Sequence, residues 1–201
     1  MKRIVAIAAA VIAVVGLGIF LAGLGGARTD RVVTLAETQC QESSSLVLLA
    51  QSVPRAQLVP CLTEGAEGWI IAEESYTSDG SVVKLVIGGL SGAEWTITLT
   101  ASCTPDPGAT DRAYPDQQGR YQVVGVESTD PDDGTETDTE WYQFDGGCTT
   151  SSVAIPSRFD SQRIFDELDS GFVFAPRSAV AQFVVDESDG RLTLDPPGTT
   201  P

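Results

Sequence analysis

Four cysteines are the residues whose type and spacing best indicate chemistry in this sequence. They are Cys40, Cys61, Cys103 and Cys148. An even number of cysteines in an exported domain is typical of a disulfide framework. We expect Cys40 to pair with Cys61 and Cys103 with Cys148, because each pair encloses its own segment, while the two other pairings stay open. A zinc site would need closely spaced Cys-x-x-Cys pairs, and the sequence has none.

A second candidate site is the acidic run from Glu127 to Glu140, which contains seven acids and no basic residue. Oxygen-rich loops suit calcium, and Asp130, Asp132 and Asp133 are the best candidate ligands. The run departs from the EF-hand pattern because Gly134 falls one place early and a proline follows Asp130. The alternative interpretation is an ordinary solvated loop.

The residue types argue against the common catalytic arrangements. Histidine is absent, so Ser-His-Asp and Cys-His catalysis and histidine metal sites are excluded in their usual forms. The glycine-rich stretch GLGIFLAGLGG lies in the apolar amino-terminal run, where glycines ease helix packing. Pairs of carboxylates could hydrolyse glycosidic bonds, but the acids are too numerous to single out a pair. We therefore expect neither enzymatic activity nor a cofactor.

The amino-terminal residues 1–27 differ from the rest of the chain. Ile4 to Leu24 is an unbroken run of 21 apolar or glycine residues. As a helix rising about 1.5 Å per residue, this run would span about 30 Å, the thickness of a bilayer core. It predicts a transmembrane anchor, and the alternative is a cleaved signal peptide, whose apolar core normally has about 7–15 residues. Since structural disulfides form outside the cytoplasm, we expect a single-pass cell-membrane protein with its carboxyl-terminal part extracytoplasmic.

The net charge of the domain limits which kinds of partner it can bind. Residues 28–201 contain ten basic and 28 acidic residues, a difference of −18, since Lys2 and Arg3 precede them. A surface with this charge repels nucleic acid and anionic lipid. We therefore exclude nucleic acid as a partner and expect another envelope protein, with the membrane contacted through the amino-terminal helix.

The remaining pattern predicts an α+β fold. After a juxtamembrane linker at 28–39, we expect one exported domain at 40–195 and a disordered tail at 196–201. A short helix near 43–53 ends at Pro54, and an extended segment then reaches Cys61. An antiparallel sheet is predicted from strand patterns at 69–76, 81–90, 94–103, 120–127, 141–148 and 149–155.

The connections and the carboxyl-terminal part complete this prediction. Residues 104–119 and 128–140 resemble loops because they are rich in Pro, Gly and Asp. Two helices at 159–171 and 177–190 are predicted to begin at the caps Asp160 and Ser178. A short strand at 191–194 follows them. Strands followed by helices favour helices packed on one face of the sheet.

The strand aromatics have two interpretations. They could line a glycan-binding face, but aromatic residues at alternating strand positions are more often core. The residues concerned are Trp69, Trp95, Trp141, Tyr142 and Phe144.

Four stretches together resemble a family of uncharacterised membrane-anchored proteins from actinobacteria. They are AQSVPRAQLVPCL (50–62), YQFDGGC (142–148), FAPR (174–177) and GRLTLDPP (190–197), accompanied by Gly68–Trp69 and Cys103. The resemblance covers residues 40–197 and implies one anchored, exported domain with four cysteines and no particular activity. The sequence departs from the family pattern after Cys148, where TTSSVAI replaces an aromatic and basic strand. We expect a non-enzymatic interaction module of the cell envelope, with a calcium- or glycan-binding module as the alternative.

Overall fold

The computed structural model describes residues 32–35, 38–41, 44–63, 66, 68–87, 92–114, 119–168 and 171–196. The predicted anchor at 1–27 lies outside these residues. Within the described ranges, no helix is long and apolar enough to cross a membrane. The described elements form an α+β fold with antiparallel sheets, as the sequence predicts.

The main sheet has seven antiparallel strands in the order β4-β5-β6-β10-β9-β8-β7. Two runs of hairpins, β4 to β6 and β7 to β10, meet in the middle where β6 pairs with β10. The strands are β4 Trp69–Thr77, β5 Gly80–Ile87, β6 Glu94–Thr100, β7 Thr110–Arg112, β8 Gln122–Thr129, β9 Glu136–Phe144 and β10 Gly147–Ile155.

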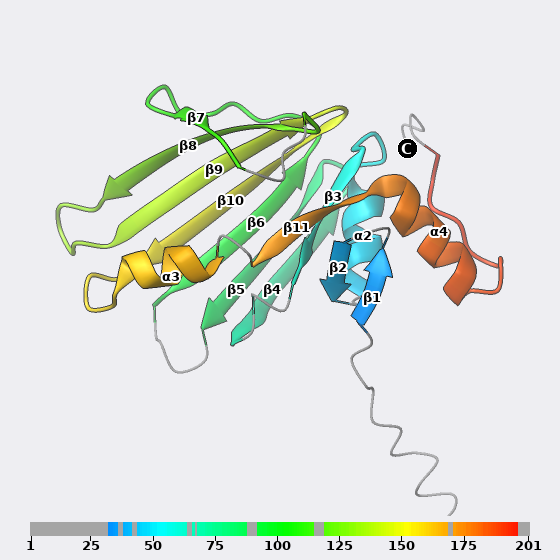
Figure 1. Ribbon diagram of the computed structural model, residues 1–201, viewed down its shortest axis with the longest axis horizontal. Coiled ribbons are helices and arrows are strands. Elements are labelled where there is room, and N and C mark those ends of the chain that lie inside the picture. The colour runs from blue at the N-terminus through cyan, green and yellow to red at the C-terminus, as the bar shows by residue number, and fades with distance from the viewer. Residues whose placement is uncertain are drawn as a thin grey trace, which may run out of the picture. The chain divides into compact units, whose positions relative to one another are not determined.

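One face of this sheet, called here the inner face, carries the hydrophobic core. Along β6 the residues alternate strictly, with Trp95, Ile97 and Leu99 buried and the threonines between them half-buried. This alternation follows from the two-residue period of a strand and confirms the prediction for this segment. The inner face is covered by α2 (Ser44–Ser52), α3 (Ser161–Leu168) and a two-stranded ribbon of β3 (Leu58–Leu62) with β11 (Phe172–Pro176) (Figure 1). Helix α4 (Arg177–Glu187) packs against α2 and β11.

A crossover segment, residues 101–109, joins β6 to β7 across the opposite, outer face. It must pass β10, β9 and β8 because β7 lies at the far edge of the sheet. It is bonded to β10 through Cys103 and Cys148, and it passes β8 at Gly108, where an added Cβ would lie 4.0 Å from Val126 Cγ2. Trp141 lies on the outer face between these two points and is 7% exposed, so the crossover segment helps to bury it.

A short hairpin of β1 (Val32–Leu35) and β2 (Thr38–Gln41) precedes the first helix. β1 falls within the segment predicted as a linker. β2 contains Cys40 and contacts β3, which contains Cys61. The side chain of Cys40 lies outside the described residues, so the Cys40–Cys61 bond stays a prediction.

Two loops predicted from composition were partly wrong. Residues 104–119 contain the edge strand β7, which pairs with β8. Residues 128–140 form a loop only from Asp130 to Thr135, because β8 extends to Thr129 and β9 begins at Glu136. The acids of β9 have poor strand propensity, and Asp138 and Glu140 are stabilised there by Arg112 from β7.

Two predictions near the carboxyl end were also wrong: the strand at 191–194 and the cap at Ser178. Residues 191–194 are not a strand. The strand β11 at residues 172–176, which was not predicted from the sequence, forms through pairing with the distant β3. Helix α4 begins after Pro176, with no side-chain cap, and Ser178 lies inside its first turn. The backbone N–H of Arg177 donates to the carbonyl of Gln57 at 2.8 Å, so a tertiary contact replaces the capping side chain.

Candidate functional site

A charged cluster, of which Glu140 is buried and Arg112 and Asp138 are half-buried, lies on the inner face of β9 and is called here the buried charged cluster. Asp138 and Glu140 alternate on this strand, and the Arg112 side chain from β7 reaches both across β8. The guanidinium binds Asp138 with both terminal nitrogens, at 2.8 and 2.9 Å, and Nη1 also donates to Glu140 Oε1 at 2.7 Å. Nη2 lies 3.3 Å from the exposed carboxylate of Glu127. One cation therefore holds three carboxylates.

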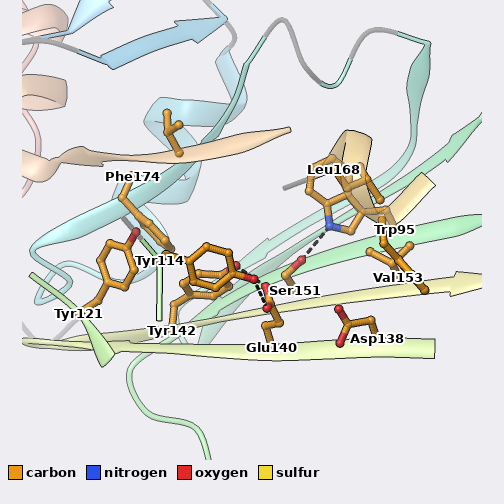
Figure 2. A pocket seen from close by; sticks show the side chains of 12 residues that line it. Trp95, Tyr114, Tyr121, Asp138, Glu140, Tyr142, Ser151, Val153, Leu168 and Phe174 are labelled. Atoms are coloured by element: carbon orange, nitrogen blue, oxygen red, sulfur yellow. Dashed lines mark hydrogen bonds between the residues drawn. The ribbon is translucent and has the colours of Figure 1, made fainter. Parts of the chain in front are cut away.

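Two tyrosines complete the bonding of Glu140, which is 8% exposed. The hydroxyl of Tyr114 donates to Oε1 and the hydroxyl of Tyr142 donates to Oε2. Figure 2 shows these side chains together with the neighbouring bond from Trp95 Nε1 to Ser151 Oγ, at 2.9 Å. Glu140 is thus satisfied by internal donors, as a buried carboxylate must be.

The cluster changes the titration of its members. Burial opposes the charge of Arg112, but its hydrogen bonds and ion pairs with Asp138 and Glu140 outweigh burial and raise the pKa of Arg112. Burial raises the pKa of Asp138, although Arg112 opposes this shift. Burial, followed by the neighbouring charge of Glu140, raises the pKa of Tyr142. Tyr142 is therefore a neutral hydrogen-bond donor at physiological pH.

The space next to the cluster is small. Its cavity volume is about 50 Å³, and Phe165, Leu168 and Phe174 close it from above. Such a volume holds a few water molecules rather than a sugar ring. Asp138 and Glu140 are a pair of carboxylates on one strand, but both are bonded to the same arginine. The cluster joins β7, β8 and β9, and a structural role explains its geometry.

The predicted calcium ligands lie at the tip of the β8–β9 hairpin. Asp130 Oδ1 accepts the N–H of Asp132 and Asp133 Oδ1 accepts the N–H of Thr135, both at 2.8 Å. The hydrogen bonds from Thr135, first from its backbone and then from its side chain, lower the pKa of Asp133. In the described part of the chain, no three His, Cys, Asp or Glu side chains are grouped to hold a metal ion. Calcium binding through Asp130, Asp132 and Asp133 stays a prediction.

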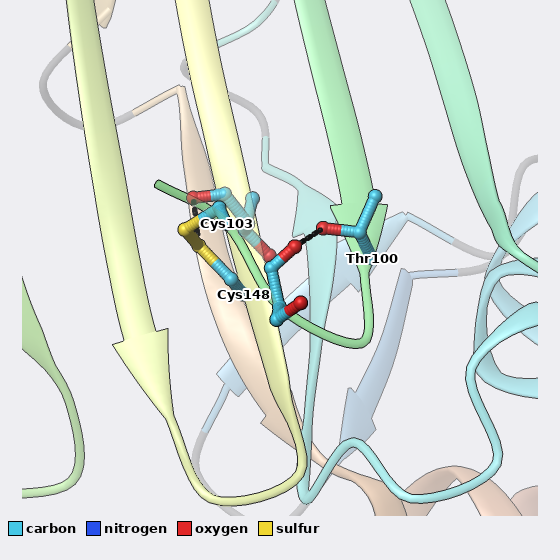
Figure 3. The surroundings of a disulfide bond; sticks show 5 residues. Thr100, Cys103 and Cys148 are labelled. Carbon is cyan, nitrogen blue, oxygen red and sulfur yellow. Dashed lines mark hydrogen bonds between the residues drawn. A yellow bond between two sulfur atoms is a disulfide. The ribbon is translucent and has the colours of Figure 1, made fainter. Parts of the chain in front are cut away.

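The cysteines and the aromatic residues are mostly interior. The predicted Cys103–Cys148 disulfide is confirmed, with a Cα–Cα distance of 5.7 Å (Figure 3). Trp95, Trp141 and Tyr142 are buried, whereas Trp69 and Phe144 are half-buried and pack against the core. The core interpretation is therefore confirmed for Trp95 and Tyr142, and for Trp69 and Phe144, which pack against the core, whereas Trp141 is buried on the outer face.

A groove of about 1150 Å³ lies among the described residues and is named here the arginine groove. Its floor is apolar, and its sides carry three arginines from distant parts of the sequence. The lining residues used below are Arg55, Leu58, Arg120, Phe144, Arg177, Ser178, Ala181 and Leu194.

The four stretches that define the family resemblance all contribute to the arginine groove. Residues 55–58, 143–145, 176–177 and 194–196 line it, one group from each stretch. Backbone bonds join three of these groups, because Gln57 N–H donates to the carbonyl of Asp145 at 3.1 Å and Arg177 N–H donates to that of Gln57. The β9–β10 turn packs tightly here, since a Cβ at Gly146 would lie 1.9 Å from the carbonyl oxygen of Arg55. Sequence reasoning noticed the stretches but gave no sign that they meet.

Comparisons with known proteins add no relative. No protein-family model, curated protein or solved structure matches the chain significantly. The resemblance to the actinobacterial family stays an expectation, and the functional argument rests on the geometry of the groove.

Proposed function

We propose that this protein is a membrane-anchored, extracytoplasmic interaction module that docks another envelope protein in the arginine groove without catalysing a reaction. The convergence of the four stretches on one groove supports this proposal most directly. The volume of about 1150 Å³ exceeds the usual range of small-molecule pockets, about 300–1000 Å³, and suits a segment of a protein.

The rigidity of the groove supports the same function. Its walls are joined by the backbone bonds of Gln57, and Leu58 and Leu194 in its floor are 6% and 9% exposed. A preformed binding surface loses little conformational entropy when a partner docks. The buried charged cluster, in contrast, has no open space for a substrate or partner.

Site-specific photo-crosslinking in the native membrane tests the docking site. A benzoylphenylalanine at Ser178, on the groove side of α4, should capture one dominant envelope protein. The matched control is the same residue at Glu187, which is exposed at the other end of α4. Equal capture from both positions, or none from Ser178, would contradict the proposal.

The captured protein is then purified and its affinity measured directly. Ala181→Trp places a large side chain in the groove and should weaken binding at least about tenfold, whereas Glu187→Trp should leave it unchanged. Binding to Ala181→Trp with wild-type affinity would remove the groove from the interaction.

The location of the domain has a separate test. Alkaline phosphatase requires disulfides, so a fusion after Pro201 should be active in cells if the domain is extracytoplasmic. An inactive but abundant fusion would place the domain in the cytoplasm.

A further inference from the structure

The arginine groove reverses the charge of the domain that contains it. Residues 28–201 carry a charge of −18, yet the groove is lined by three arginines and only two acids, Asp145 and Asp195. Three features produce this local excess of positive charge: the buried Arg177, the start of α4, and two exposed arginines.

Arg177 is a buried cation without a contacting carboxylate among the described residues. It is 6% exposed, and its guanidinium donates to two backbone carbonyls, those of Ala50 and Asp195. The carboxylate of Asp195 instead accepts from Gln51 Nε2 at 3.2 Å. Burial accordingly lowers the pKa of Arg177, and Asp195 offsets this shift only in part. Arg112 is different, since three carboxylates surround it.

The start of α4 adds a positive potential at the same place. Pro176, Arg177, Ser178 and Ala181 line the groove, so the amino end of this eleven-residue helix opens into it. No side chain caps this end, and its first turn contains no acid. Although the N–H of Arg177 is bonded to Gln57, the dipole of the helix still makes its amino end favourable for negative charge.

Two exposed arginines at the rim of the arginine groove can donate hydrogen bonds to a ligand. Arg55 and Arg120 are exposed on two sides of the groove. In the part of the chain that the structure describes, Arg55 makes no ion pair. A guanidinium binds a carboxylate through two parallel N–H bonds, which makes arginine well suited to recognise an acidic side chain.

From this charge pattern we propose that the arginine groove binds an extended acidic segment of the partner protein, with its carboxylates at Arg55 and Arg120 and its apolar side chains against Leu58, Phe144 and Leu194. This inference rests on the proposed docking function and specifies the chemistry of the docked segment. Carboxylates at Arg55 and Arg120 bring negative charge into the same groove as Arg177, which has no contacting carboxylate among the described residues. The apolar floor selects a peptide over a free inorganic anion.

Two peptide pools test this chemistry on the full-length protein in detergent. One pool randomises leucine and glutamate over its positions, and the other randomises leucine and glutamine at the same length. Retention is measured at about 0.15 M ionic strength, where the overall charge of the domain is screened beyond about 8 Å. The glutamate pool should be retained at least about tenfold more strongly. Equal retention of both pools would overturn the proposal.

Variants of the exposed arginines locate the contact. Arg55→Gln with Arg120→Gln should reduce retention of the glutamate pool about tenfold or more without changing the melting temperature. Arg191→Gln is the matched control, because the side chain of Arg191 is 78% exposed and does not line the groove. Wild-type retention by the double variant would overturn the proposal. Arg177 is not substituted, since its bonds brace the fold.

Other occupants give distinct results. Competition by inorganic phosphate at the concentration of the peptides would reduce the groove to a small-anion site and overturn the proposal. Self-association that the double variant abolishes would assign the groove to a second copy and overturn it as well. If crosslinking from Ser178 identifies a partner but the glutamate pool is not retained, the docking function stands and the acidic chemistry fails.

Discussion

The side chain of Arg112 lies directly across Gly125, and a methyl group added to this glycine would come 2.3 Å from Arg112 Nε. The missing side chain on β8 is what lets an arginine from β7 reach the carboxylates of β9. The sheet edge is thereby held by charge as well as by backbone bonds. The contacts of Arg112 with Asp138 and Glu140 therefore depend on the absence of a side chain at Gly125.

Gly125→Ala should destabilise the protein by about 3 kcal/mol, because displacing Arg112 leaves Asp138 and Glu140 buried without their cation. Urea denaturation measures this change in the free energy of unfolding.

Gly108→Ala is the control for this prediction. Its new methyl group would lie 4.0 Å from the nearest side-chain atom, so the variant should destabilise the protein by less than about 0.5 kcal/mol. In an Arg112→Ala background, which removes the atoms that the new methyl group would meet, Gly125→Ala should cost little. An additive double variant would contradict the proposed coupling.

Gly146→Ala and Gly190→Ala form a second matched pair. Both glycines have positive φ, 74° and 75°, so both variants should incur the strain of the left-handed conformation, about 1–2 kcal/mol. A Cβ at Gly146 also meets the carbonyl oxygen of Arg55 at 1.9 Å, whereas Gly190 has nothing within 4 Å. We expect Gly146→Ala to lower the free energy of unfolding by at least about 2 kcal/mol more. Equal melting curves would contradict the packing described here.

Replacing both Cys103 and Cys148 by alanine should destabilise the protein by about 4 kcal/mol, the chain-entropy value for a cross-link between residues 45 apart. Release of the crossover segment should also expose Trp141 on the outer face. Guanidinium denaturation measures stability, and acrylamide quenching of tryptophan fluorescence measures exposure. Unchanged quenching would show that the crossover segment stays in place without the bond.

The raised pKa of Tyr142 predicts that the stability of the fold falls at alkaline pH. Its pKa is raised in the folded state, first by burial and then by Glu140, so the folded protein holds this proton more tightly than the unfolded chain does. Its contribution to stability is complete below the unfolded pKa of about 10 and declines as pH rises above it. Between pH 8 and 11, wild-type stability should fall more steeply than that of Tyr142→Phe. Parallel curves would contradict this assignment.

The sequence was informative where a local period or a local cap decides the structure. The alternation in β6 and the cap at Asp160, whose Oδ1 accepts the N–H of Arg163 at 3.3 Å, were both visible in it. β9 was missed in part, because Glu136, Asp138 and Glu140 resemble a solvated loop until Arg112 is brought beside them. The arginine groove was missed entirely, since it depends on long-range pairing such as that of β3 with β11, which no local pattern encodes.

During synthesis, β6 is made well before its partner β10, although the two lie side by side in the middle of the finished sheet. The growing chain therefore carries an open strand edge at β6 until residues 147–155 emerge. Open edges recruit other chains, and contacts between distant residues form slowly. The interval between the completion of Thr100 and the completion of Ile155 thus exposes the unfinished sheet to aggregation.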